Sequence, residues 1–172
     1  MLLRSWRRWI TIIALFACLS PLMLTASAEE SGWSTSFDPR KRVFLSFRSV
    51  KDGPRTLLLG CLRDVDTFTI VSEGVAEAPS NGDKATLTLT NGEIRYTADG
   101  EVSADPGTGT PGFSTDIDLD AATVRQLRDA LLPVLEGKSP IQLAIGPVHR
   151  DLPVSGLADA LKRFKSVCFG IR

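Results

Sequence analysis

The sequence is poor in the residues and motifs that carry most enzyme chemistry. It has a single histidine, His149, which cannot form a histidine metal cluster and which could act as a general base only beside a nucleophile and an orienting group. No serine lies in a Gly-x-Ser-x-Gly nucleophile elbow. The glycine-rich run at 107–112 lacks the Lys-Ser/Thr pair that ends a phosphate-binding loop. The sequence therefore carries no catalytic or nucleotide-binding signature.

The first 28 residues have the three parts of a cleavable export signal. Arginines at 4, 7 and 8 form a basic start, residues 9–24 are almost wholly apolar, and Ala26-Ser27-Ala28 is a small-x-small cleavage site. Pro21 would end the signal helix and leave an extended segment for the peptidase. We expect a signal peptide over 1–28 and a single exported domain over 29–172, periplasmic or secreted.

Two other interpretations of this segment remain open. A permanent anchor needs about 20 unbroken apolar residues, and Ser20-Pro21 interrupts the run. Leu15-Phe16-Ala17-Cys18 resembles a lipobox, although Phe16 is bulky for that motif and apolar residues follow Cys18 where a lipoprotein turns polar. Cleavage after Ala28 is favoured, so we expect Cys18 to leave with the signal and no permanent membrane span to remain.

Charge limits the choice of partner. Three of the 20 basic residues and none of the 20 acidic ones precede Glu29, so residues 29–172 carry 17 against 20, a net charge of −3. A nucleic-acid-binding surface is clearly basic, so this balance argues against nucleic acid, and it offers no simple case for binding anionic lipid. A protein or cell-envelope partner remains.

Cys61 and Cys168 would be the two cysteines left after cleavage. Export places them where oxidation is favoured, so we predict a Cys61–Cys168 disulfide. It would close a loop of roughly 100 residues, worth about 4–5 kcal/mol in the chain-entropy model, and would tie down the C-terminal segment. A reactive thiol is the alternative, but no cluster of activating residues accompanies either cysteine in the sequence.

The mature chain mostly has the two-residue period of β-strands. Strands are predicted over 42–50, 55–63 and 67–71, the second a central one because it is apolar on both faces. Asn91-Gly92 predicts a hairpin with a two-residue type I′ turn, which places Leu89 opposite Ile94 and Leu87 opposite Tyr96. Residues 99–115 lose this periodicity and gain glycine and proline, which predicts a long surface loop.

The helices come late. Asp120 is a candidate N-cap for a helix from Ala121 to about 135, which Pro133 should kink or shorten and Gly137 should end. Strands are predicted over 141–145 and 148–154, and Ser155 is expected to cap a final amphipathic helix. This order indicates an α+β fold, a mostly antiparallel sheet or sandwich with two late helices packed on it.

The ending Leu152-Pro153-Val154-Ser155-Gly156-Leu157, followed by a short helix and Cys168, resembles the close of small exported bacterial proteins. The likeness is to type VI secretion accessory proteins of the VasI type and, more loosely, to invasion-associated locus B proteins. Trp33 near the mature start and Cys61 after an apolar strand fit the same layout. The resemblance covers the two ends of the chain and implies an exported, disulfide-linked, non-enzymatic domain.

Acidic residues offer the remaining candidates for chemistry. Asp116, Asp118 and Asp120 alternate on one face of an extended segment and could bind calcium, but Ala121 and Leu127 stand where an EF-hand needs glycine and glutamate. The preferred interpretation is an edge strand whose charges discourage aggregation, with Asp120 as the helix cap.

Two further groups could serve a hydrolase. Asp64 and Asp66 could in principle hydrolyse a glycosidic bond, yet they fit a turn better. His149 with Ser155 or Ser166 is a second possibility, and an exposed histidine is the simpler interpretation. We assign no catalytic, cofactor or metal residues.

We therefore expect a non-enzymatic binding or accessory protein that acts on an envelope, cell-wall or secretion component. The alternatives are a small periplasmic hydrolase that uses carboxylates or His149, and a secreted enzyme inhibitor, which shares the same binding physics.

Overall fold

The computed structural model describes residues 31–74, 82–104 and 109–170 of the chain. The predicted signal peptide over 1–28, its cleavage site and Cys18 lie outside these residues, so they stay predictions. None of the helices in the described ranges is both long and apolar enough to cross a membrane.

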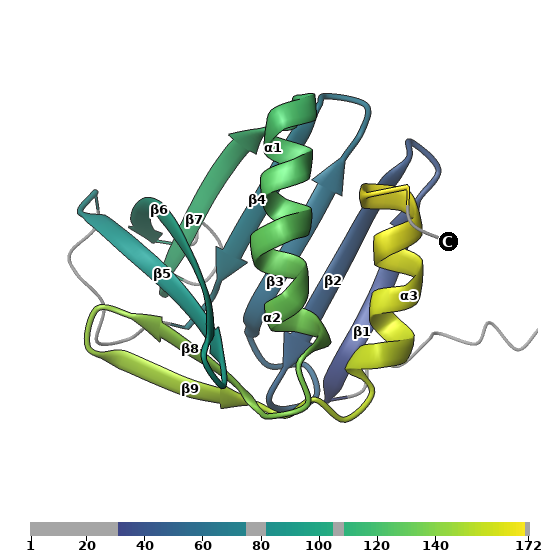
Figure 1. Ribbon diagram of the computed structural model, residues 1–172. Coiled ribbons are helices and arrows are strands. Elements are labelled where there is room, and N and C mark those ends of the chain that lie inside the picture. Colours follow the sequence, from purple (N-terminus) through teal and green to yellow (C-terminus); the bar gives the residue numbers. More distant parts are fainter. Residues whose placement is uncertain (1–30, 75–81, 105–108, 171–172) are drawn as a thin grey trace, which may run out of the picture.

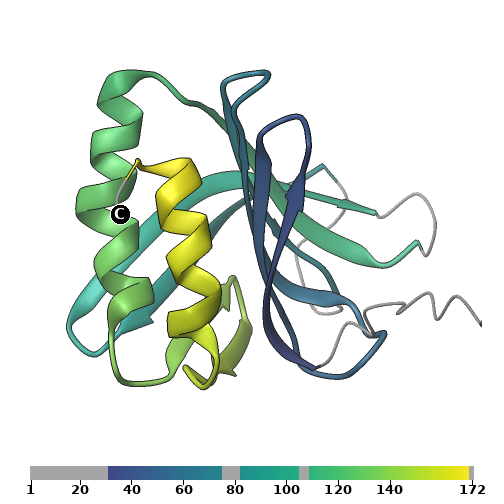
Figure 2. The same ribbon diagram turned by 90° about the vertical axis from the view of Figure 1, so that its right-hand side faces the viewer.

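The fold is α+β, as predicted, and consists of one strongly curved antiparallel sheet with helices on one face (Figures 1 and 2). The alternative of two packed sheets is not what forms. The nine strands lie in the spatial order β1-β2-β3-β4-β7-β6-β5-β8-β9. They are β1 Gly32–Asp38, β2 Arg42–Arg48, β3 Arg55–Leu62, β4 Thr67–Ser72, β5 Lys84–Asn91, β6 Ile94–Ala104, β7 Pro111–Asp118, β8 Ile141–Ile145 and β9 Val148–Leu152.

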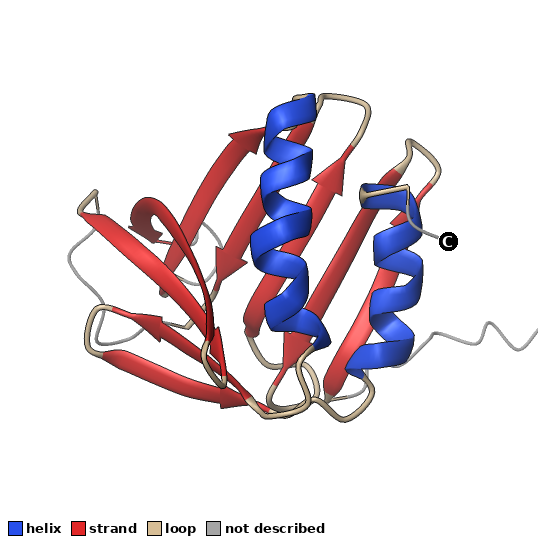
Figure 3. Ribbon diagram, viewed as in Figure 1, coloured by secondary structure: helices blue, strands red, loops and turns tan. Residues whose placement is uncertain are grey.

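The helices follow the first seven strands, with the β8–β9 hairpin between them (Figure 3). The first runs without a break through α1 (Ala121–Gln126), a π-helical turn η1 (Leu127–Leu131) and α2 (Leu132–Glu136). Pro133 does not shorten this helix, although it has no backbone N–H to donate. The residue before it, Leu132, donates its N–H to Leu127 O in the wider π-helical turn of η1. Asp120 caps the start, accepting from Thr123 N at 2.7 Å, and Gly137 follows the last residue, both as predicted.

The core lies between the sheet and the helices. Strand residues alternate in burial, so that Val43, Leu45 and Phe47 of β2 face the helices and are buried. Leu127, Leu131 and Leu135 form the buried stripe of the long helix. The final helix, α3 (Leu157–Cys168), buries Leu157, Leu161, Phe164 and Cys168 against the sheet. Burial of these side chains is the main force that holds the helices on the strands.

The hairpin exists, but its turn lies one residue later than predicted, so the pairing is shifted by two residues on the second strand. Asn91 pairs with Ile94 and Leu89 pairs with Tyr96, so the turn residues are Gly92 and Glu93. The physical reason is that Asn91 is a buried strand residue, 5% exposed, whose side chain donates to Ser139 O at 2.7 Å. Gly92 then occupies the first turn position with φ of 61°, where glycine is favoured.

The long surface loop predicted over 99–115 is wrong. Strand β6 continues to Ala104 and β7 begins at Pro111. Gly100 is a packing residue within β6: a Cβ there would lie 2.6 Å from Cζ of Phe113, a fully buried ring. This glycine gives the neighbouring aromatic ring room inside the sheet.

The start of the last helix also differs. Its N-cap is Gly156, with φ of 79° and no side-chain hydrogen bond to the helix, while Ser155 is exposed. The left-handed conformation at this position favours glycine over serine.

Candidate functional site

The Cys61–Cys168 disulfide fixes the last helix to the sheet. Cys61 lies on β3 and Cys168 at the end of α3; the two are 107 residues apart in sequence, with Cα atoms 5.7 Å apart, and both are fully buried. The predicted bridge is therefore present. Arg63, just after β3, donates from its guanidinium to the carbonyl oxygen of Cys168 and strengthens the same attachment.

Three further contacts hold α3 along its length. Phe164 packs edge-on against Phe68 of β4, with ring centroids 6.3 Å apart. Thr35 of β1 donates from its hydroxyl to Ala160 O at 2.6 Å. At the N-terminal end, Trp33 Nε1 donates to Pro153 O at 2.5 Å. With the disulfide, these contacts from β1 and β4 fix α3 at its C-terminal end and in its middle, and fix the segment that leads into its N-terminal end.

A groove of about 560 Å³ lies between α3 and the end of α2. The two helices run side by side in opposite directions (Figures 1 and 2). The groove is lined by the end of α2, the residues before α3 and the first turns of α3: Leu135, Glu136, Gly137, Lys138, Val154, Leu157, Ala158, Leu161 and Lys165. Its walls are mainly apolar, which is the usual composition of a binding groove.

Charged side chains border this groove. Lys165 Nζ lies 2.5 Å from Glu136 Oε1, so an ion pair links α3 to the end of α2. Lys138 is exposed and makes no side-chain hydrogen bond or ion pair with the part of the chain that the structure describes. The α2–α3 groove, defined by the nine residues above, therefore combines an apolar floor with an available cation.

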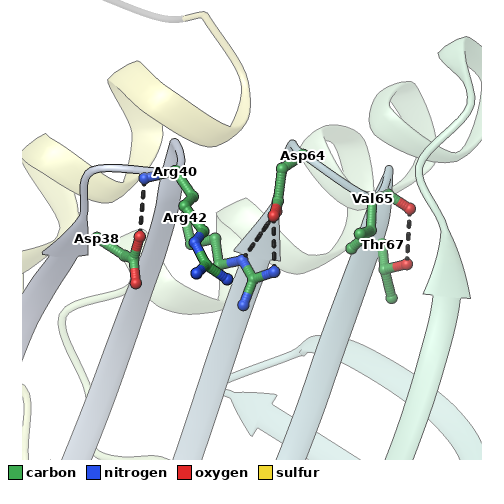
Figure 4. Close-up of polar contacts among 6 residues, drawn as sticks. All are labelled: Asp38, Arg40, Arg42, Asp64, Val65 and Thr67. Atoms are coloured by element: carbon green, nitrogen blue, oxygen red, sulfur yellow. Dashed lines mark hydrogen bonds and ion pairs between the residues drawn. The ribbon is translucent and has the colours of Figure 1, made fainter.

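Asp64, one of the two carboxylates considered for glycoside hydrolysis, is engaged in an ion pair. Arg42 donates from Nε to Asp64 Oδ1 at 2.8 Å and from Nη2 to Oδ2 at 2.6 Å (Figure 4). This pairing, chiefly through the hydrogen bond, lowers the pKa of Asp64 and raises the pKa of Arg42. A general acid needs a raised pKa, so Asp64 is poorly suited to that role.

The surrounding turns in Figure 4 are stabilised locally. Asp38 accepts from Arg40 N at 2.7 Å, and the Thr67 hydroxyl donates to Val65 O at 3.1 Å. Asp66 has a left-handed φ of 47°, and its carbonyl oxygen accepts from Leu119 N at 2.7 Å. Asp64 and Asp66 thus belong to a turn, as the preferred interpretation held.

The three alternating aspartates are not on an edge strand. β7 lies inside the sheet, between β4 and β6, so that prediction is wrong. β6 pairs with β7 only as far as Ser114, so Asp116 and Asp118 have a paired strand, β4, on one side only. Asp120 caps α1, and the cap hydrogen bonds lower its pKa. In the described ranges, no three His, Cys, Asp or Glu residues are grouped so that they could hold a metal ion.

Where β6 and β7 diverge there is a second hollow of about 370 Å³. Its lining is polar and includes Lys84, Asp99, Glu101 and Asp116. Lys84 is paired with Glu101 at 2.6 Å, which lowers the pKa of Glu101. This hollow lacks the apolar surface that would give a partner hydrophobic binding energy.

His149 lies on β9, and Ser155 and Ser166 lie before and within α3; all three side chains are exposed. The Ser166 hydroxyl donates to Arg163 O at 3.1 Å, within its own helix. Among the described residues, His149 forms no side-chain hydrogen bond, and neither serine is joined to it. The structure does not assemble these residues into a catalytic group.

Sequence reasoning did not identify the α2–α3 groove. The periodicity of the two helices predicts that Leu135, Leu157 and Leu161 belong to the core. The groove depends on how the two helices are placed relative to each other, which their periodicity does not show. The exposed Ala158 beside Leu157 and Leu161 was the one local signal that a small residue opens this side of α3.

No protein-family model matches the chain, and no curated protein or solved structure matches it with statistical significance.

Proposed function

We propose that this protein is an exported, non-enzymatic binding or accessory protein that acts on another component of the cell envelope, the cell wall or a secretion system. The observation that carries the proposal is the apolar groove between α2 and α3, one wall of which is tied to the sheet by a buried disulfide. A rigid apolar groove lowers the entropic cost of binding, since its walls need not be ordered when a partner arrives.

Three features support export. The three-part signal pattern stands at the start of the sequence. The disulfide between Cys61 and Cys168 is of the kind that forms and persists in oxidising compartments. The resemblance of the chain ends to VasI-type accessory proteins points to the same compartment and to a binding role.

Site-specific photo-crosslinking in the producing cells tests the proposal. A photoreactive residue at Ala158 lies in the groove, and one at Thr97, exposed on β6, serves as the control. We expect position 158 to crosslink to one discrete envelope component and position 97 to give no such product. Equal products from both positions, or none from position 158, would contradict the proposal.

The same samples report export. The intact mass of the crosslinking protein should correspond to a chain that starts at Glu29 and contains one disulfide. A chain that retains residues 1–28, or one that begins at a lipidated Cys18, would contradict cleavage after Ala28.

A further inference from the structure

We infer that the α2–α3 groove binds an amphipathic helix of an envelope protein, one that carries acidic side chains beside its apolar stripe. This inference rests on the proposed binding function and names the chemistry of the partner. It follows from the shape of the groove, the state of the backbone along its walls and the charges around it.

The walls favour a helix over an extended peptide. Six of the nine lining residues lie in α2 or α3 and none lies in a β-strand, so the groove offers an extended peptide no strand edge to join. A helical partner satisfies its own backbone groups. Leu157, Leu161 and Lys165 stand four residues apart on α3 and span about 12 Å, or two helical turns. Leu157 and Leu161 are almost fully buried and form the floor of the groove, and the small exposed Ala158 beside them leaves space for the side-chain ridges of another helix.

The charges favour an acidic partner. α3, the end of α2 and the residues just after α2 carry four basic and two acidic side chains, of which two basic and one acidic line the groove, whereas residues 29–172 have a net charge of −3. The basic ones are Lys138, Lys162, Arg163 and Lys165, and the acidic ones are Glu136 and Asp159.

Most of these charges already have local partners. Lys165 pairs with Glu136, and the Arg163 guanidinium lies over the Phe37 ring, 5.3 Å from its centroid. Lys162 lies 3.9 Å from Asp159. Lys138 is therefore the lining cation positioned to meet a carboxylate of the partner, at the end of the groove next to α2.

An anionic lipid would satisfy the same two chemical requirements, an apolar part and a negative group. The described residues, however, give this groove two walls and no roof, so an acyl chain lying in it would keep one side in water along its length. A helix can turn an apolar face into the groove and a polar face to water. The open shape therefore favours a protein partner.

A selection experiment tests the partner chemistry. The probe is a displayed library of helical peptides with apolar residues fixed at i, i+4 and i+7 and all other positions randomised. It is panned on the full chain, expressed for export and purified in its oxidised form. We expect the enriched peptides to carry Asp or Glu next to the apolar stripe. Enrichment of basic or neutral peptides, or no enrichment, would overturn the inference.

Three variants then locate the binding. Lys138→Glu should weaken binding of the selected acidic peptide by about fivefold and should favour its Glu-to-Lys counterpart. Ala158→Trp, which fills the groove, should weaken binding by about tenfold or more. Lys51→Glu makes the same charge change in the exposed β2–β3 turn and should stay within about twofold of the parent chain.

Binding that is unaffected by both groove variants would place the peptide elsewhere and refute the inference. Displacement by sodium laurate, together with failure to select any peptide, would identify the occupant as a lipid and also refute it. Crosslinking through position 158 to a partner without an acidic helix would leave the binding function standing and this inference wrong. Binding of the selected peptide in vitro without any crosslink from position 158 in cells would count against the proposed binding function and not against the chemistry of the groove.

Discussion

The side chain of Asn91 lies directly against Gly137, where the β5–β6 hairpin meets the end of α2. Asn91 Nδ2 donates to Ser139 O at 2.7 Å, and a Cβ built on Gly137 would lie 2.2 Å from Asn91 Cγ. The backbone after α2 can therefore pass close to the hairpin only because residue 137 has no side chain. This contact fixes the end of α2, one wall of the α2–α3 groove, relative to the sheet.

A double-mutant cycle tests this contact. Asn91→Ala should cost about 1–3 kcal/mol because it leaves a buried cavity and removes the hydrogen bond to Ser139 O. Gly137→Ala should cost about 1–3 kcal/mol because its Cβ collides with Asn91. The double variant should lose less than the sum, since the shorter side chain at 91 makes room for the new Cβ. Urea unfolding measures all three.

Ser139→Ala is the matched control. Asn91 bonds to the backbone carbonyl of Ser139, whose side chain is exposed, so this substitution should leave stability nearly unchanged. Strict additivity in the double variant would mean that Asn91 and Gly137 do not share this space.

The disulfide should contribute a large part of the stability. It closes a separation of 107 residues, and its removal in Cys61→Ala/Cys168→Ala should cost about 4–5 kcal/mol in the chain-entropy model. Unfolding in urea, compared with that of the oxidised parent chain, gives the difference. Either single alanine variant should lose a comparable amount, because each one breaks the same bridge.

Thiol labelling is the direct check on the connectivity. The denatured, unreduced mature protein should show no free thiol, and a non-reducing gel should show a monomer. Two labelled thiols would refute the bridge, and a reducible dimer would mean that the cysteines pair between chains.

The Arg42–Asp64 pair predicts a stability change in acid. Because the folded-state pKa of Asp64 lies below its ordinary value, the pair stabilises the fold above that ordinary value. This stabilisation is lost as the pH falls through the lowered pKa. The urea midpoint, followed from about pH 7 to about pH 2, should therefore decline at the acid end.

Asp64→Asn and Arg42→Gln should each flatten part of this acid decline. The double variant should flatten it no further, because both substitutions remove the same interaction. The effect should be small, since both side chains are partly exposed, at 26% and 27%. An acid decline that is identical in all four proteins would show that other carboxyl groups cause it.

Much of the fold could be predicted because its signals are local or chemically restrictive. The alternation in β2, the Asp120 cap and the stripe through Leu127 and Leu131 each depend on neighbours in sequence. The disulfide was predictable for a different reason: once Cys18 is assigned to the signal, two cysteines allow one intramolecular pairing.

The errors arose where a residue has a distant partner. Asn91 is a residue type typical of turns, but its buried contact with Ser139 makes it the last residue of a strand. The hairpin turn therefore lies one residue later than predicted. Gly100 is a residue type typical of loops, but it lies within a strand, where the Phe113 ring packs in the space that a side chain would occupy. The α2–α3 groove depends on the placement of two helices that the disulfide and Asn91 fix from outside the groove, so neither helix sequence alone could reveal it.

Tyr96 offers a clean test of core packing, because it is the sole tyrosine of the chain. It lies on β6 opposite Leu89, is 6% exposed, and burial raises its pKa to about 12. A raised pKa of this kind means that the fold favours the neutral phenol. The stabilisation is complete below the unfolded pKa of about 10 and is lost as the pH rises towards 12.

Tyrosinate absorbance followed against pH should have its midpoint near 12 in the native protein and near 10 in concentrated urea. Tryptophan fluorescence, recorded on the same samples, shows whether the fold persists at each pH. Tyr96→Phe removes the ionisation and should flatten the loss of stability above about pH 10. Ionisation near pH 10 while the native fluorescence persists would show that the Tyr96 hydroxyl is open to water and that this part of the core is packed less tightly than the structure indicates.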